Sequence, residues 1–129
     1  MPDPATTATS SFRFSYGALR PLLSSLGMGP GLSGIHLEGD TLRVHMGWAF
    51  RALVPVHQIS AVEPRQGFPG GIGVHGWRGR WLVNGATTGL LAITIDPPVR
   101  AWATGIPVHL RQLTLSLEDP DALQAALGR

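Results

Sequence analysis

The sequence predicts a small, mainly β domain with antiparallel strands, and three observations support that prediction. Between Leu42 and Val56 every even-numbered residue is apolar, whereas odd positions include Arg43, His45 and Arg51. This period of two is typical of strands with one face in a core and the other in water. Further short apolar runs are separated by Gly, Pro and Asn turn residues, and one short amphipathic helix is expected at the C-terminal end.

The alternating segment is too long for one straight strand. Fifteen extended residues would span roughly 50 Å at about 3.3 Å each, whereas a compact domain of 129 residues is only about 35 Å across. We therefore expect the chain to fold back around Gly47, with Trp48 on the inner face. Ala49 and Leu53 would add apolar surface to the outer face.

Residues 34–46 predict a hairpin that turns at Gly39-Asp40. Pairing Glu38 with Thr41 places four apolar side chains on one face, and a slip of one residue would destroy this agreement. The four are Ile35, Leu37, Leu42 and Val44. The outer face of the hairpin would then hold His36, Arg43 and His45.

The remaining elements follow from local signals. A helical turn is expected within 17–26, with Pro21 in its first turn, followed by a glycine-rich loop at 27–31. Asp119 as N-cap, Pro120 and Gly128 bound a C-terminal helix whose Leu123, Ala126 and Leu127 share a face. We expect this helix to plug an open edge or end of a curved sheet. The other expected elements are strands at 12–16, 50–56, 61–62, 81–83, 90–95, 99–104 and 108–117, a loop at 64–76 and a turn at Asn84-Gly85.

Composition limits the functional classes. The chain has no cysteine, and its ten cationic side chains are all Arg, for a net charge of +2. Between residues 41 and 117, seven arginines face two carboxylates, which falls short of the clustered patch typical of nucleic-acid binding. No stretch is apolar enough to span a membrane, and we see no basic and apolar leader. We expect a flexible tail over 1–11, a single domain over 12–129 and a cytoplasmic location.

The order of these elements resembles the bacterial pleckstrin-homology-like domains over roughly residues 34–128. The resemblance rests on a hairpin at 39–44, a strand ending in 54–59, a Gly-rich stretch at 71–74 before a Trp strand, and the approach to the helix at 115–120. It implies a strongly bent antiparallel barrel or sandwich of about seven strands, capped by the C-terminal helix. It also implies a module that is mostly non-catalytic. The basic loop that binds inositol lipids in eukaryotic relatives has no counterpart here, so we do not expect that activity.

The run from Trp77 to Trp81 is the candidate ligand site. Arg78 and Arg80 lie between two indoles, and such a set can hold an anion, because Arg binds phosphate in a bidentate manner and Trp offers a π-face. The alternative is a loop-to-strand junction in which Trp81 packs inward and the Arg stems cover apolar surface. The candidate ligand-binding residues are His75, Trp77, Arg78 and Arg80, within a loop spanning 68–81.

Other motifs favour structural interpretations. Residues 71–76 form a literal GxGxxG, but no strand leads into it and no helix follows, so we expect a flexible loop instead of a dinucleotide site. His36 and His45 with Glu38 could hold zinc, although their spacing matches no familiar metal motif. Solvated or hydrogen-bonded histidines are the simpler interpretation, and we expect no cofactor and no metal.

No arrangement of residues predicts an enzyme. Ser33 lies in a sequence that departs from the nucleophile elbow at Ile35, and Glu118, Asp119 and Asp121 are explained by helix capping. The leading hypothesis is a non-catalytic module that acts through contact with another protein or through self-association. The alternative is a binder of a small anionic or amphipathic ligand through the 68–81 loop.

Overall fold

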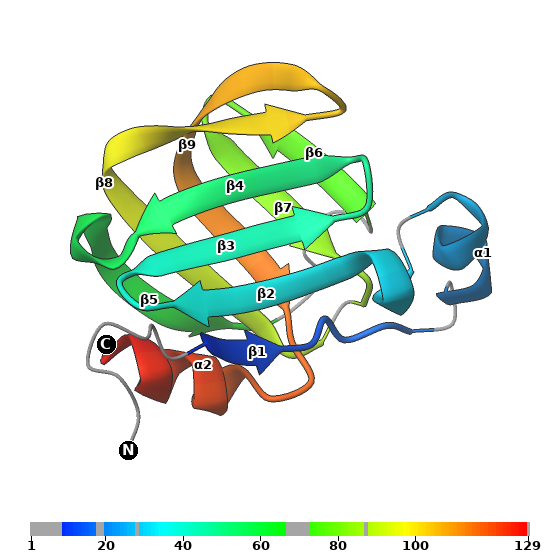
Figure 1. Ribbon diagram of the computed structural model, residues 1–129, viewed down its shortest axis with the longest axis horizontal. Coiled ribbons are helices and arrows are strands. Elements are labelled where there is room, and N and C mark those ends of the chain that lie inside the picture. Colours follow the sequence, from blue (N-terminus) through cyan, green and yellow to red (C-terminus); the bar gives the residue numbers. More distant parts are fainter. Residues whose placement is uncertain (1–8, 18–19, 28, 67–72, 87, 129) are drawn as a thin grey trace.

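The computed structural model describes residues 9–17, 20–27, 29–66, 73–86 and 88–128 (Figure 1). The strands are β1 (Thr9–Phe12), β2 (Ser33–Glu38), β3 (Thr41–Met46), β4 (Phe50–Pro55), β5 (Ile59–Arg65), β6 (Gly73–Trp77), β7 (Arg80–Asn84), β8 (Leu90–Ala103) and β9 (Ile106–Ser116). The helices are α1 (Arg20–Ser25) and α2 (Pro120–Leu127), with short 3₁₀ turns η1 (Pro30–Leu32) and η2 (Val56–Gln58). The protein is therefore mainly β, as the sequence predicts.

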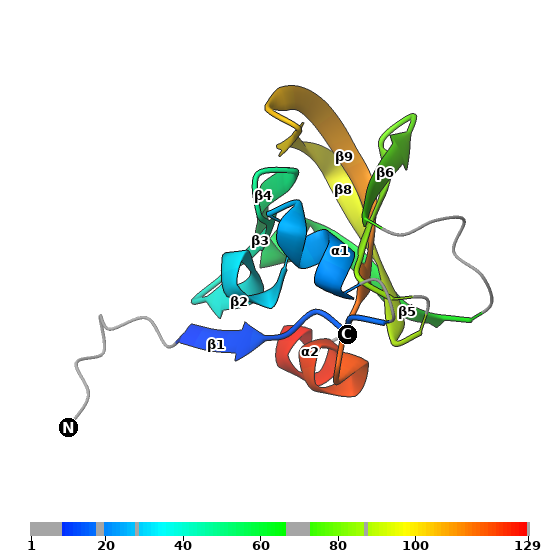
Figure 2. The same cartoon turned by 90° about the vertical axis from the view of Figure 1, so that its right-hand side faces the viewer.

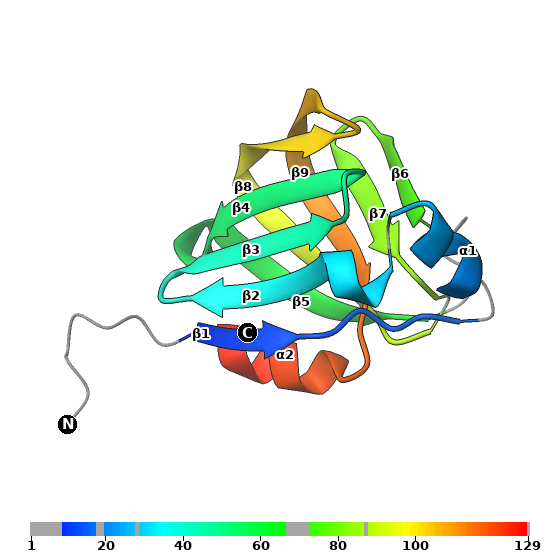
Figure 3. The same ribbon diagram turned by 45° about the vertical axis from the view of Figure 1, so that its right-hand side comes forward.

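The strands form one strongly bent sheet that does not close. Its order is β1-β2-β3-β4-β8-β9-β7-β6, and β5 pairs with β8 away from this path. Strands β1 to β4 form one layer, which crosses in front of the layer containing β7 and β9 (Figure 3). The apolar side chains of both layers meet between them, and α2 contributes Leu123 and Leu127 to the same core.

The predicted hairpin is confirmed in its register. Glu38 pairs with Thr41, Leu37 with Leu42 and Ile35 with Val44. The chain then folds back at Gly47, whose φ of 52° lies in the left-handed region, and β4 pairs with β3. Local alternation and one turn signal were enough here, because both strands lie within a few residues of each other.

The C-terminal helix is also confirmed. The Asp119 carboxylate accepts a hydrogen bond from the backbone N–H of Ala122 at 3.1 Å, and Gly128 ends the helix with φ 69°. Leu123 and Leu127 are buried, but Ala126 is exposed, so the apolar stripe is narrower than predicted. The helix lies beneath β1 at one end of the sheet (Figure 1).

The strand count differs from the prediction of about seven. There are nine strands in the described residues, and β7 runs parallel to β9, whereas an antiparallel sheet was expected. Thr9, Ser10 and Ser11, assigned to the flexible tail, form part of β1, and residues 1–8 lie outside the described residues. Phe14 and Tyr16, predicted within a first strand at 12–16, make isolated bridges to Leu117 and Gly85.

The expected loop at 64–76 is wrong at both ends. Strand β5 starts at Ile59, before the predicted 61–62, and continues through Pro64 to Arg65, and β6 begins at Gly73. Pro64 is tolerated because β5 pairs only with β8 among the described strands, and an edge strand can accommodate a residue without N–H. Residues 67–72 of that stretch lie outside the described residues.

Strand β8 replaces two predicted strands. The break expected at Asp96-Pro97-Pro98 is a bulge, since Thr94 pairs with Gln112 but the next pair is Val99 with Leu110. The first half of β8 pairs with β5 and the second half with β4, so this bulge lets one strand serve both layers. The hairpin turn to β9 is at Thr104-Gly105.

Asn84-Gly85 does not form the expected tight turn of a hairpin, because β7 lies beside β9 and β6 and does not pair with β8. Gly85 is buried instead, and a Cβ there would lie 2.5 Å from Cδ1 of Tyr16. Glycine is thus required at this position for the close approach of the N-terminal segment.

Candidate functional site

The outer face of β3, β4 and the second half of β8 carries basic, aromatic and aliphatic side chains. His45 pairs with Arg51, and Arg51 pairs with Trp102, so these three side chains form a row across the sheet. Arg43 and Leu53 are a second cross-strand pair on the same face. Because the residues between these rows point into the core, the two rows stand apart on the surface.

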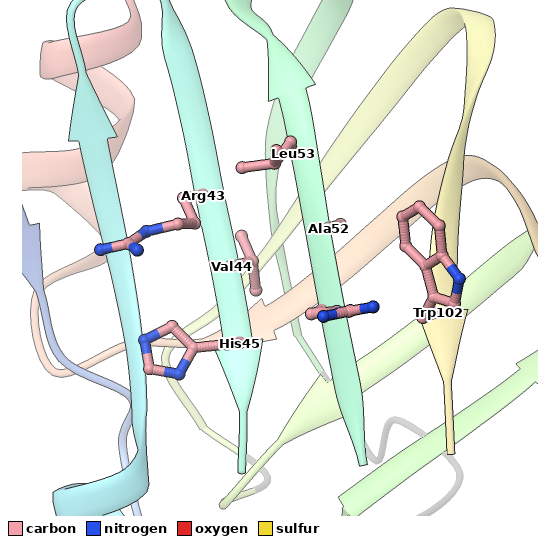
Figure 4. Close-up of a pocket in the computed structure, with 7 residues that line it drawn as sticks. Arg43, Val44, His45, Ala52, Leu53 and Trp102 are labelled. Atoms are coloured by element: carbon pink, nitrogen blue, oxygen red, sulfur yellow. The ribbon is translucent and has the colours of Figure 1, made fainter. Parts of the chain in front are cut away.

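A shallow hollow of about 490 Å³ lies between the rows (Figure 4). Val44 and Ala52 form its floor, since their side chains are buried and their backbone faces outward. Arg43, His45 and Arg51 supply polar groups around it, and Leu53 and Trp102 supply apolar surface. Leu53 is 57% exposed, which is high for a leucine in the middle of a strand.

Arg51 and Trp102 form a cation–π pair. The guanidinium carbon of Arg51 lies 5.0 Å from the centroid of the Trp102 ring. This contact is within the range of favourable cation–π interactions and leaves the N–H donors of the guanidinium at the surface of the hollow. The pair thus offers hydrogen-bond donors, positive charge and an aromatic surface together.

The charge on this face is predominantly positive. Arg43 contacts Glu38 at 3.0 Å, and both side chains are partly exposed, so this ion pair contributes little to stability. It does, however, offset the charge of Arg43. Within the described residues, the structure shows no carboxylate paired with Arg51. An approaching anion would meet Arg51 first.

His36 and His45 are coupled on the same face. Their Nε2 atoms are 3.4 Å apart, and their ring planes are within 12° with centroids 5.5 Å apart, so the rings meet edge to edge. Gly34 allows this contact, since a Cβ there would lie 2.7 Å from Nε2 of His36.

The hydrogen bonds assign the tautomers of this pair. The carbonyl of Leu32 can only accept, so Nδ1 of His45 donates to it at 3.1 Å. In the neutral pair, Nε2 of His36 then donates to Nε2 of His45, and Nδ1 of His36 accepts from the Ser11 hydroxyl at 3.0 Å. Burial lowers the pKa of His36, and the charges of Arg43 and His45 lower it further, against an opposing effect of Glu38. The neutral pair links β1, β2 and β3.

The structure does not arrange His36, His45 and Glu38 as ligands of one zinc ion. Glu38 faces Arg43, and the two histidine nitrogens point at each other. Within the described residues, no group of three or more His, Asp or Glu side chains is placed to hold a metal ion.

The candidate residues named from sequence lie at the β6–β7 hairpin. Trp77 pairs with Arg80 across the turn and is 74% exposed, and Arg78 lies over its ring at 5.7 Å. Trp77 and Arg78 border one hollow of about 400 Å³ with His109 and Arg111. Arg80 borders a different hollow, with Asp96 and Ser60.

Trp77 and Arg78 therefore border one hollow, whereas Arg80, although it pairs with Trp77, borders another. His75 is exposed on β6 and lines neither hollow. Trp81 packs inward, with its ring 6.3 Å from that of Phe50, and covers Gly76 on the neighbouring strand. The described part of the GxGxxG stretch, Gly73 to Gly76, is β-strand and not a loop.

Sequence reasoning placed Arg43, His45 and Leu53 on the outer face but missed the hollow. Its wall is Trp102, which lies 51 positions along the chain from its pairing partner Arg51. Ala49, expected to add apolar surface there, is buried. The sequence predicts a strand at 99–104, but no local signal specifies which strand β8 will pair with.

Comparison of the chain with protein-family models, with curated proteins and with solved structures gave no match. The resemblance to pleckstrin-homology-like domains therefore stays a prediction. Among the described residues, neither α1 nor α2 is long and apolar enough to cross a membrane.

Proposed function

We propose that this protein is a non-catalytic binding module that holds an acidic, amphipathic segment of a partner protein on the outer face of β3, β4 and β8. The observation that supports this most directly is the Arg51–Trp102 pair beside exposed Leu53. An acidic side chain would meet the guanidinium, and an apolar neighbour would cover Leu53 and the indole. Aromatic and Arg side chains at the centre of a contact surface are the types that contribute most to affinity.

The lining of the hollow supports binding more than chemistry. Among the described residues that border it, none carries a hydroxyl, thiol or carboxylate. The imidazole there belongs to His45, and both of its ring nitrogens are engaged in hydrogen bonds. A catalytic base needs a free nitrogen and a nearby group to deprotonate.

The test uses peptides of defined chemistry. We expect a short Glu/Leu peptide to bind the intact chain more tightly than a Glu/Ser or a Lys/Leu peptide of the same length. Arg51→Gln and Trp102→Ala should each weaken binding about tenfold, which corresponds to about 1.4 kcal/mol. Arg65→Gln, an exposed arginine on β5, is the matched control. Equal affinity in the Arg51 and Arg65 variants would refute this function.

A second function is favoured by one observation at the β6–β7 hairpin. Trp77, Arg78, Trp81, His109 and Arg111 border the same hollow, so two guanidiniums and two indoles converge there. We propose a small anionic or amphipathic compound as its ligand. A panel of phosphates, sulfates and fatty acids should raise the melting temperature of wild type but not of Arg78→Ala. A shift retained in that variant would exclude the site.

A further inference from the structure

Five large apolar side chains lie exposed at one end of the molecule. They are Leu22 of α1, Leu26 directly after α1, Leu32 of η1, Trp48 of the β3–β4 turn and Ile106 at the start of β9, each between 49% and 63% exposed. We call this set the apolar end. Figure 2 views the molecule from this end, with α1 toward the reader, the β3–β4 turn beside it and the β8–β9 turn above them.

Hydrogen bonds hold these segments together. The indole N–H of Trp48 donates to the carbonyl of Leu26 at 2.6 Å, and the N–H of Gly47 donates to the carbonyl of Leu32 at 3.0 Å. The N–H of Thr104 donates to the carbonyl of Ala49 at 2.8 Å, which joins the β8–β9 turn to the β3–β4 turn. The backbone segments that carry these side chains are therefore adjacent.

The exposure of Trp48 is built into the fold. Alternation along the chain predicted an inward Trp48, but the turn at Gly47 places the residue outside the sheet. Its ring lies against Gly27, where a Cβ would be only 3.1 Å from Cδ1 of the indole. The ring is thus fixed at the surface with its N–H satisfied.

The apolar end is also unusual among the exposed surfaces. Seven large apolar side chains are exposed in the described residues, and five of them are here. Single exposed apolar residues are ordinary, but several on adjacent segments are typical of a surface that contacts a partner or a membrane.

The charges around the apolar end are positive. Its segments, residues 17–33, 46–51 and 102–107, contain no Asp or Glu and include Arg20 and Arg51. The carboxylates of Glu38 and Asp40 lie near the β2–β3 turn, at the far end of the same strands (Figure 1). Glu118, Asp119 and Asp121 lie at the start of α2. Positive charge therefore accompanies the apolar side chains, and negative charge lies elsewhere.

We propose that the apolar end docks this protein on the surface of an anionic lipid bilayer. The apolar side chains would enter the interfacial layer, and Arg20 and Arg51 would face the anionic headgroups. Tryptophan suits that layer because it combines a large apolar ring with a polar N–H. Apolar contact and charge attraction together determine binding of this kind.

The shape of the surface favours a bilayer over a globular partner. The apolar side chains project from a short helix, a 3₁₀ turn and two hairpin turns. A protein partner would need a concave surface matched to each projection, whereas a lipid interface adapts to all of them. This docking surface meets the hollow beside Leu53 at Arg51. Its exposed apolar side chains lie outside that hollow, so the proposal does not depend on the proposed peptide binding.

The test measures co-sedimentation of the intact chain with vesicles. One set consists of phosphatidylcholine alone, and the other contains a quarter phosphatidylglycerol. We expect binding to the anionic vesicles, loss of most of it in half-molar salt, and little binding to the neutral vesicles. Brominated acyl chains should quench part of the tryptophan fluorescence in the bound protein, and the quenching should be smaller for Trp48→Phe.

Variants separate this surface from the rest. Leu22→Ser with Leu32→Ser should lower the bound fraction at least about fivefold, and Trp48→Ala should do so by a similar factor. Both changes are at exposed positions, and circular dichroism with thermal unfolding confirms that the variants are folded. Leu53→Ser, at the exposed leucine outside the apolar end, is the control and should bind as wild type. Absence of binding to anionic vesicles, equal binding to neutral ones, or full binding by the Leu22/Leu32 variant would overturn the proposal.

Discussion

Replacing Ser116 by Ala should destabilise the protein far more than the loss of one oxygen suggests. Ser116 is fully buried at the end of β9. Its Oγ accepts from the backbone N–H of Gly85 at 2.9 Å and donates to the carbonyl of Ser15 at 3.0 Å. One hydroxyl therefore joins the N-terminal segment and the end of β7 to β9.

The magnitude follows from what the substitution leaves behind. Losing the hydrogen bond to the carbonyl of Ser15 costs about 1 kcal/mol, and leaving the buried N–H of Gly85 without an acceptor costs about 1–3 kcal/mol. We expect a loss of about 2–4 kcal/mol in the free energy of unfolding, measured by equilibrium denaturation in urea. The backbone bond from Ser15 N–H to the carbonyl of Ser116, at 2.9 Å, stays in the variant. The change therefore tests the side chain alone.

A matched control is Ser60→Ala. The hydroxyl of Ser60 is exposed, and its contact with the carbonyl of Thr94 is long, at 3.4 Å. The effect of this substitution should stay within about 0.5 kcal/mol. If Ser116→Ala cost no more than Ser60→Ala, the close contact of the N-terminal segment with β7 and β9 would be wrong.

Three further predictions concern single residues and the whole chain. Asp119→Ala should cost about 1 kcal/mol in urea denaturation, since it removes the N-cap of α2, and Asp119→Asn should restore most of it. Because the folded-state pKa of His36 lies below its ordinary value of 6.5, the unfolded chain binds more protons in the window below 6.5. Stability should therefore fall as pH drops through that window, and His36→Gln should flatten this part of the profile of unfolding free energy against pH. If the outer face binds a segment of another protein, light scattering coupled to size-exclusion chromatography over a concentration series should show a monomer. A defined oligomer that Arg51→Glu dissociates would favour self-association instead.

Local patterns were sufficient where the partners of a strand are close in sequence. The register of 34–46 followed from one turn at Gly39-Asp40 and from the requirement that Ile35 and Val44 share a face. The same holds for α2, because Asp119 and Gly128 are signals that act within one turn. In both cases the interactions that decide the structure lie within the segment itself.

Elements that depend on distant partners could not be predicted. Strand β7 pairs in parallel with β9, some thirty positions away, and nothing near Asn84-Gly85 distinguishes that pairing from a tight turn. The prolines after Asp96 suggested a break, but the long β8–β9 ladder absorbs them as a bulge. The loop predicted to begin at Pro64 is wrong for the same reason, because pairing with Leu91 of the distant strand β8 outweighs the preference of proline for loops.

The candidate site illustrates this division clearly. Alternation alone predicted that Arg43, His45 and Leu53 point outward. The hollow that they line also needs Trp102, which is brought there by the pairing of β4 with β8. Trp48 shows the opposite error, since alternation predicted it to be buried and a local turn exposes it. The functional surfaces lie where the regular pattern ends or meets a distant strand.

The two proposed surfaces meet at Arg51 and Trp102, which also border a smaller depression with Trp48 and Gly105. The apolar end lies beside the β3–β4 and β8–β9 turns, at the ends of these strands, whereas the hollow lies on the outer face of the sheet (Figures 1 and 4). A molecule docked by the apolar end would keep this face open beside the bilayer. The two activities should therefore separate: Leu53→Ser should weaken the Glu/Leu peptide and spare vesicle binding, and Leu22→Ser should do the reverse. If either substitution abolished both activities in a folded protein, the surfaces would be one site, because independent contacts more than a few side chains apart contribute additively.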